Sequence, residues 1–299
     1  MVCSLKDESL FEIFIDQLGK LRKRGVLDSS VHIANKGRME IYVKPMFYNY
    51  ARGKLQITGD ENLMKFVNSN FKKDSFGSWS AVTGIYGTKK YVAAVKDEVK
   101  VAMKNVAKVK FINDVLLNFM KWLPFESINT VEYAIRPLYE ITKGKPSNVS
   151  LHTVHWPLGH KPLDTDLDPE KCNCGQLYYL PILPAKGGMA KMVVDEINRS
   201  FSFGNFIPYI TLNMVTRDTL EGVVNLAFDR RNTQQDARAR ECVDKLTDKL
   251  IREGIYPCRV DIDSMNKVVD RDNSYWQLVS ALKKTFDPNG IIAPGRYNF

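Results

Sequence analysis

The sequence predicts an α+β protein in which an antiparallel sheet carries helices packed on one face. Two strand–helix–strand units support this prediction, one over residues 79–112 and a second beginning at Gly175. The composition of the 299 residues, 44% hydrophobic and 26% charged, is that of an ordinary globular protein. Successive units of this form feed one sheet and place their helices in one layer.

The first unit has the clearer periodicity. Residues 79–86 are rich in strand formers and end before Gly87, and residues 109–112 form a second short apolar strand. Between them, residues 88–108 predict a helix, because apolar residues recur at steps of three and four: Val92, Val95, Val99, Ala102 and Val106. Ahead of this unit, residues 8–24 predict a first helix and residues 61–68 a short one.

The second unit begins with a strand over residues 177–184, whose two prolines indicate a sheet edge or a strand end. A helix over 188–200 follows, and then strands over 206–215 and 223–228. Residues 232–253 predict a longer helix with Gly254 in the C′ position. Residues 258–262 are a last strand candidate.

The formal charge of +9 and the pI of 9.1 raise the question of an anionic partner. The lysines are spread, no run of five like charges occurs, and no RNA-binding aromatic motif lies among them, so we expect no nucleic-acid partner. An acidic partner surface or an anionic ligand is the alternative explanation of the positive charge. No stretch of about 18 uncharged apolar residues occurs, so we expect no membrane partner. The polar, acidic start lacks a secretory signal, which favours a cytoplasmic protein.

The cysteines and histidines are the candidate metal ligands. Five cysteines, an odd number, favour free thiols in a reducing compartment. Cys172 and Cys174 form a C-x-C without a second pair, which argues against a zinc site. The prolines and glycine around His152, His155 and His160, ahead of Asp164, Asp166 and Asp168, predict a loop. We therefore expect no metal, with a histidine site as the weaker alternative.

The end of the chain carries a specific motif. Residues 286–297, FDPNGIIAPGRY, contain two turns and a pair of anchoring apolar residues, and they resemble the closing motif of the vanillyl-alcohol oxidase and 4-cresol dehydrogenase family. Three further stretches resemble family motifs in the same order: Gly84–Gly87, Cys174–Pro184 and Glu253–Arg259. The resemblance covers nearly the whole chain but only the C-terminal half of a typical member.

The resemblance implies a domain organisation and a cofactor. Residues 1–253 would form a ferredoxin-like cap domain over the substrate, and residues 254–299 a closing segment that returns to a flavin-binding domain. The flavin-binding N-terminal half would be absent, in keeping with the lack of any glycine-rich phosphate loop. FAD would be bound only together with that domain or subunit. It would be non-covalent, because residues 217–223 lack the tethering histidine or tyrosine. The resemblance is also compatible with a homo-oligomer.

The same resemblance identifies candidate site residues. Arg259 matches the arginine of the family's Tyr-Arg pair, and Arg296 matches a basic position near the flavin. Both are therefore candidates for catalysis and cofactor binding, since a fixed cation stabilises a phenolate or a reduced flavin. The simpler alternatives are an ion pair of Arg259 with Asp261 or Asp263, and a surface position for Arg296.

Cys258 stands where the family has a phenol-binding tyrosine. A thiol is a weaker hydrogen-bond donor than a phenol, so this departure weakens the expectation of a phenol substrate. Tyr256, two residues earlier on the same strand face, is the candidate substitute. Both residues are taken as candidate substrate-binding residues.

The implied reaction is hydride transfer from a small aromatic substrate, a para-substituted phenol or benzylic alcohol, to flavin N5. Two alternatives stay open: an FAD-linked 2-hydroxy-acid dehydrogenase subunit, whose arginines would bind a carboxylate, and a truncated chain without catalytic activity.

Overall fold

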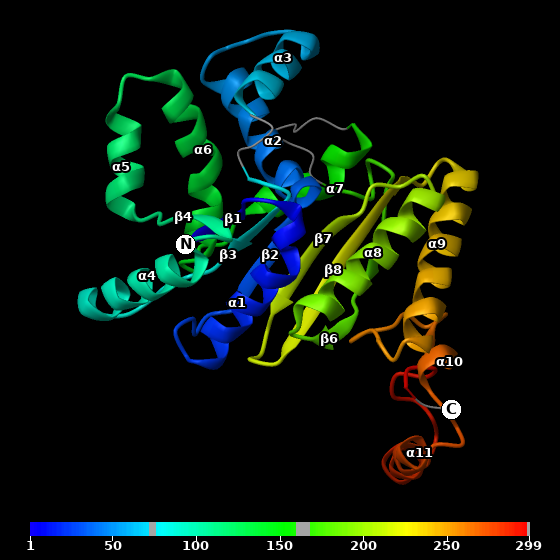
Figure 1. The fold of residues 1–299 in the computed structure, drawn as a ribbon. Coiled ribbons are helices and arrows are strands. Elements are labelled where there is room, and N and C mark those ends of the chain that lie inside the picture. Colours follow the sequence, from blue (N-terminus) through cyan, green and yellow to red (C-terminus); the bar gives the residue numbers. More distant parts are fainter. Residues whose placement is uncertain (72–75, 160–167, 298–299) are drawn as a thin grey trace.

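The structure is a computed structural model that describes residues 1–71, 76–159 and 168–297. Within these ranges, an eight-stranded sheet has the order β4-β1-β3-β2-β7-β8-β5, and β6 pairs with β8 (Figure 1). Every pairing between these strands is antiparallel. The predicted α+β class is confirmed. The strands are β1 (Val2–Leu5), β2 (Val31–Asn35), β3 (Trp79–Val82), β4 (Ala107–Lys110), β5 (Cys174–Tyr179), β6 (Ile182–Pro184), β7 (Tyr209–Met214) and β8 (Thr219–Asp229).

The main hydrophobic core lies between one face of this sheet and a layer of four helices, α1 (Phe11–Lys23), α4 (Lys89–Met103), α8 (Gly187–Phe203) and α9 (Thr233–Arg252). Alternate residues of β7, Ile210, Leu212 and Met214, are fully buried in it. Phe14 of α1 and Phe201 of α8 are also fully buried. Each such side chain contributes about 1.5–3 kcal/mol, so this layer supplies much of the stability of the fold.

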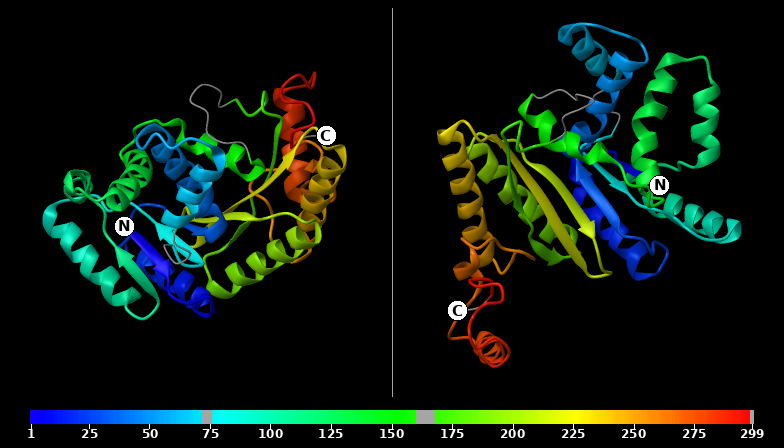
Figure 2. Two further views of the ribbon diagram at one scale, coloured as in Figure 1. Left: turned by 90° about the horizontal axis from the view of Figure 1, so that it is seen from above. Right: turned by 180° about the vertical axis from the view of Figure 1, so that it is seen from behind.

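The opposite face of the sheet is polar along β7 and β8, where Thr211, Asn213, Glu221 and Asn225 alternate with the core residues. Viewed from behind, β7 and β8 lie in front of α8 (Figure 2). The helices α2 (Lys36–Gly53) and α7 (His152–His155) pack against strands of the sheet, and Gly37 of α2 lies next to the ring of Tyr209 on this polar face. The polar face is therefore only partly covered.

A second, smaller core joins α2 to α3 (Asp60–Asn70) and α6 (Glu126–Ile141). Its centre contains Val43, Phe47, Leu63, Phe71 and Ala134. The predicted short helix at 61–68 is confirmed as α3. Sequence reasoning missed α2, which contains Pro45 and is buried on several sides, so it shows no single apolar stripe.

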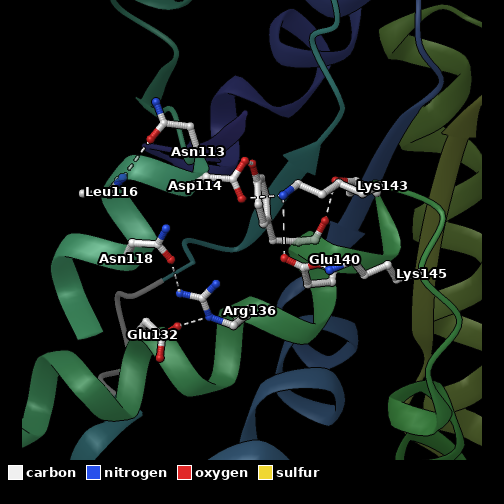
Figure 3. Close-up of polar contacts among 11 residues, drawn as sticks. Asn113, Asp114, Leu116, Asn118, Glu132, Arg136, Glu140, Lys143 and Lys145 are labelled. Atoms are coloured by element: carbon white, nitrogen blue, oxygen red, sulfur yellow. Dashed lines mark hydrogen bonds and ion pairs between the residues drawn. The ribbon is translucent and has the colours of Figure 1, made fainter. Parts of the chain in front are cut away.

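The helix α5 (Asp114–Trp122) forms a hairpin with α6 that is held by polar contacts (Figure 3). Lys143 pairs with Asp114, and Arg136 bonds to Glu132 and to Asn118 Oδ1 at 3.2 Å. The other side of α5 leaves Val115, Phe119 and Trp122 exposed by 77%, 61% and 87%. The hairpin therefore lies beside the main core.

Three local predictions are corrected. The helix predicted over 88–108 ends at Met103, because the chain turns there to begin β4 at Ala107. The stretch predicted as a histidine loop forms the short helices α7 and η3 (Trp156–Leu158), preceded by η2 (Asn148–Leu151). His160, Asp164 and Asp166 lie outside the described residues.

The predicted strand over 258–262 does not form. Residues 256–258 make only an isolated bridge, Pro181 to Pro257, because the chain then turns away into α10 (Met265–Val268). The last helix, α11 (Ser274–Phe286), has no buried residue and extends away from the sheet (Figure 1). Near the other terminus, η1 (Glu8–Leu10) leads into α1. None of the described helices is long and apolar enough to span a bilayer.

Candidate functional site

The candidate site is built where the chain after α9 runs along the break between β5 and β6. Ile182 N donates a hydrogen bond of 2.8 Å to the carbonyl of Tyr256, and Cys258 N donates one of 2.8 Å to the carbonyl of Leu180. These bonds fix the segment 256–258 against the sheet. They bring the Cys258 thiol to Glu221 of β8, whose Oε1 accepts its hydrogen bond at 3.3 Å.

Gly222 allows β8 to come close to Pro181, which forms a bridge with Pro257 of this segment. Its amide donates to the carbonyl of Pro181 at 2.7 Å, and a Cβ at this position would lie 2.7 Å from Pro181 Cγ. A side chain is therefore excluded, and Glu221 is held beside Cys258. Sequence reasoning examined Glu221 only as part of a tethering stretch. The signal that it missed is the glycine that follows.

The electrostatics of the site keep Cys258 neutral. Burial, followed by the hydrogen bond to Glu221, raises the pKa of the Cys258 thiol to about 11, although the Arg259 cation opposes the rise. The thiol is therefore a hydrogen-bond donor at neutral pH. Arg259 is exposed, and within the described ranges it makes no ion pair with Asp261 or Asp263. Tyr256 is also exposed, by 49%.

Tyr297 returns to the same place. Val260 N donates a hydrogen bond of 3.4 Å to Tyr297 Oη, and the Tyr297 ring stacks on Trp276 at an interplanar angle of 3°. Arg259 directly precedes Val260 and Arg296 directly precedes Tyr297, so both arginines are adjacent in sequence to this contact. Arg296 itself is exposed. The structure therefore brings the two predicted arginines to one region of the chain.

Asp287 fixes the turn that leads to Arg296. Its carboxylate accepts hydrogen bonds from Ile291 N at 2.9 Å and Ile292 N at 2.8 Å, and it pairs with Lys283. The Lys283 ammonium, with these two amides, lowers the pKa of Asp287 below its usual value. The closing motif is thus a carboxylate-centred turn.

In the part of the histidine region that the structure describes, His155 lies next to a cysteine. His155 Nδ1 and Cys174 Sγ are 3.6 Å apart, and burial raises the pKa of the Cys174 thiol to about 11. Among residues 1–71, 76–159 and 168–297, no group of three or more histidine, cysteine or acidic side chains is arranged to hold a metal ion.

The amino-acid sequence was compared with known proteins. No family model matches. Over 159 residues the chain is 31% identical to a 1'-carboxy-chondrochloren decarboxylase of Chondromyces crocatus, covering 52% of this chain and 29% of that protein. Over 236 residues it is 23% identical to a 4-cresol dehydrogenase (hydroxylating) flavoprotein subunit of Pseudomonas putida, covering 77% of this chain and 39% of that protein.

Solved structures extend the likeness to almost the whole chain. p-Cresol methylhydroxylase with substrate bound superposes with a TM-score of 0.72 at 19% identity, over 99% of this chain and 52% of that one. The 4-ethylphenol oxidase of Gulosibacter chungangensis gives a TM-score of 0.73 at 14% identity, over 99% and 53%. The resemblance to the vanillyl-alcohol oxidase and 4-cresol dehydrogenase family is confirmed.

The chain covers only part of the length of these related proteins. The chain spans about half the length of the two solved proteins, and 29% and 39% of the curated relatives. The family is one of flavin-linked oxidoreductases. The individual roles of Tyr256, Cys258, Arg259 and Arg296 stay predictions, as does the division of the chain at residue 253.

Proposed function

We propose that this chain is the substrate-domain part of an FAD-dependent oxidoreductase that transfers hydride from a para-substituted phenol or benzylic alcohol to flavin N5. The supporting observation is the cluster of Glu221, Cys258 and Arg259 at the edge of the polar sheet face. A carboxylate, a neutral thiol and an exposed cation suit a substrate that loses a proton as it is oxidised.

The donor set fits the flavin ring but not the whole cofactor. Arg259 and Arg296 are exposed guanidinium groups near one contact, and they can stabilise the negative charge of a reduced flavin. The sequence has no glycine-rich loop for a pyrophosphate. FAD, once bound, supplies the redox chemistry, and a separate flavin-binding domain or subunit would hold most of it.

Within this chain, each residue of the cluster has a distinct role. Glu221 accepts the hydrogen bond of the neutral Cys258 thiol, and its carboxylate oxygen takes the proton of a substrate hydroxyl that displaces the thiol. Arg259 stabilises the resulting substrate anion. Cys258 leaves more space than a tyrosine and donates a weaker hydrogen bond, and Tyr256 contributes an exposed phenol close to it.

The partner would dock on the closing segment. Tyr275, Leu278, Leu282 and Phe286 recur at helical spacing along α11 and are exposed by 63%, 59%, 48% and 79%. An apolar stripe of this size on a helix without buried residues is typical of an interaction surface. The flavin-binding domain or subunit is the occupant that we propose for this stripe.

A second candidate is an FAD-linked 2-hydroxy-acid dehydrogenase subunit. The thiol at Cys258 favours it, because a phenolate loses its strong hydrogen-bond donor there, while Arg259 can bind a carboxylate instead. A truncated chain without activity is the third reading. It predicts no turnover with any flavin-binding partner.

Reconstitution separates these readings. The purified chain alone should lack the visible absorbance of a flavin, and it should acquire that absorbance when co-purified with a flavin-binding half of a 4-cresol dehydrogenase relative. The complex should then reduce a dye acceptor with 4-cresol.

In this complex, Arg259→Ala should lower kcat/KM by about a hundredfold, because one charged transition-state contact is lost. Arg252→Ala, at another exposed arginine at the end of α9, is the matched control. Turnover of 2-hydroxy acids but not 4-cresol would replace the first proposal by the second.

A further inference from the structure

Arg38, in the first turn of α2, is a buried cation without a counter-ion. It is 8% exposed, and its Nε and Nη1 atoms are shielded from solvent without a hydrogen-bond partner. Its guanidinium lies 5.2 Å from the centre of the Tyr42 ring. No acidic side chain in the described part of the chain pairs with it. Because arginine does not lose its charge, a buried and uncompensated guanidinium is strongly unfavourable, and an external anion would relieve the cost.

Asn225 of β8 is a second buried polar group without partners. It is 1% exposed, and neither Oδ1 nor Nδ2 makes a hydrogen bond among the residues described. Native proteins rarely leave a buried amide unbonded, and such groups commonly await a ligand or an ordered water. The amide offers both a donor and an acceptor to such a ligand.

The backbone positions of both groups lie next to one tyrosine. Tyr209 is the cross-strand neighbour of Asn225, and its ring lies 3.6 Å from where a Cβ of Gly37 would be. Arg38 directly follows Gly37, so its side chain starts within reach of this part of the polar sheet face. The Cα atoms of Tyr209 and Asn225, as partners in an antiparallel pair, are about 5 Å apart. This separation is shorter than an extended arginine side chain.

The surroundings favour a negative group here. Arg38 N donates to the capping Asn35 Oδ1 at 2.9 Å, so this is the positive end of an 18-residue helix. Glu40, the nearest acid on the helix, pairs with Lys44 at 2.8 Å. Tyr209 stays neutral, since burial first and Glu40 second raise its pKa. Neither Glu40 nor Tyr209 therefore neutralises the charge of Arg38 through an ion pair.

We propose that Arg38 and Asn225 bind a ligand that carries a carboxylate with a hydroxyl group beside it. The guanidinium has only donors and suits the planar carboxylate, with Asn225 Nδ2 as a further donor. Asn225 Oδ1 requires a donor, which the hydroxyl provides. The inference goes beyond the proposed function, because this binding involves neither a flavin nor the cluster of Glu221, Cys258 and Arg259.

The test uses the purified 299-residue chain without flavin. Mandelate, which has both groups and a ring, is the probe, and its binding is followed by calorimetry and by thermal unfolding. Phenylacetate lacks the hydroxyl, and mandelamide lacks the charge. We expect mandelate to bind about tenfold more tightly than phenylacetate and to raise Tm more than either analogue. Equal effects of mandelamide, or tighter binding of inorganic phosphate, would overturn the proposal.

Two variants make the assignment specific. Arg38→Met should raise the Tm of the free chain, because an uncompensated charge is removed, and should abolish mandelate binding. Arg22→Met is the matched control: Arg22 is 7% exposed but donates to the carbonyls of Leu27 and Ser29 at 2.8 and 3.1 Å, so its loss should lower Tm.

Asn225→Asp should raise Tm and prevent mandelate binding, because the new side chain itself supplies the carboxylate that pairs with Arg38. A lower Tm for both Arg38→Met and Asn225→Asp, or unchanged mandelate binding in them, would show that the two residues form no anion site. A reconstituted enzyme that fails with 4-cresol would leave this result standing.

Discussion

The Cys258 thiol donates its hydrogen bond to Glu221 Oε1 across 3.3 Å, although the two residues are 37 positions apart in the chain. Together with burial, this contact sets the pKa of the thiol at about 11. A neutral thiol beside a carboxylate is a hydrogen-bond donor rather than a nucleophile. The chemistry of the site therefore depends on Glu221 and Arg259.

Replacing the carboxylate should make Cys258 more reactive. In Glu221→Gln burial still raises the pKa of the thiol, but the negative charge of the acceptor is lost, so the pKa should fall part of the way toward its usual value of 9.0. A fall of about one unit makes thiolate about tenfold more abundant at pH 8. The rate of reaction with a disulfide reagent, measured in a Cys172→Ser background, should rise by that factor. An unchanged rate would mean that Glu221 does not control the thiol.

The adjacent glycines at the start of α8 should respond oppositely to alanine. A Cβ on Gly187 would lie 2.2 Å from the backbone carbonyl oxygen of Glu12, whereas a Cβ on Gly188 meets only a flexible carboxylate at 3.7 Å. Gly187→Ala should destabilise the fold by about 2–3 kcal/mol through overpacking between α1 and α8. Gly188→Ala should be neutral or stabilise by ~0.5 kcal/mol through helix propensity. Urea denaturation measures both, and equal effects would contradict the close approach of α1.

Asp287→Asn should loosen the closing turn. The wild-type carboxylate has a lowered pKa, so the stabilisation it provides is present above its ordinary value of 3.8 and is lost as the pH falls through the lower folded value. Hydrogen exchange of the Ile291 and Ile292 amides should be slow at pH 6 in the wild type and fast in the variant. Once the pH is below the lowered pKa of Asp287, the two proteins should become alike. Equal protection at pH 6 would show that the turn does not depend on the carboxylate.

Cys242→Ala should flatten the alkaline loss of stability. Burial, and then Glu241, raise the pKa of Cys242 from 9.0 to about 11, so stability is intact below pH 9 and is lost as the pH rises from 9 to about 11. This loss amounts to roughly 2 kcal/mol for a shift of that size. The alanine variant should lose less over that range, at the cost of about 1 kcal/mol at pH 7 for the smaller side chain. Thermal unfolding at pH 7, 9 and 11 measures the difference.

Flavin in a reconstituted complex should be released by acid. Residues 217–223, which form the end of the turn after β7 and the start of β8, contain no histidine or tyrosine to form a covalent link. After precipitation with acid, the fluorescence should appear in the supernatant. A yellow pellet would reveal a linkage elsewhere in the complex.

The sequence predicts elements well where one face is apolar. The helices α4, α8 and α9 and the strands β7 and β8 follow from periodicity, because each buries a single stripe against the same core. Periodicity could not reveal α2, where neighbours on several sides bury Val43, Met46 and Tyr48. The hairpin of α5 and α6 was likewise not predicted, since α5 has only Leu117 buried.

The candidate site was predictable only in part. Cys258 and Arg259 were found through a motif of adjacent residues, but the approach of Glu221 depends on pairing between segments that are distant in sequence. Arg38 and Asn225 carry no sequence signal at all. An arginine in an amphipathic helix normally reaches solvent, and only the packing of α2 on the sheet shows that this one does not.

The bridge between Pro181 and Pro257 lies where β5 gives way to β6, at one outer border of the sheet. The segment that carries Cys258 therefore occupies backbone groups that would otherwise be open to a strand from another molecule. At the other border, β4 exposes Lys108 and Lys110, whose charges discourage such addition. Removal of residues 254–299 would uncover the first border and leave its backbone groups open to pairing with a strand of another molecule.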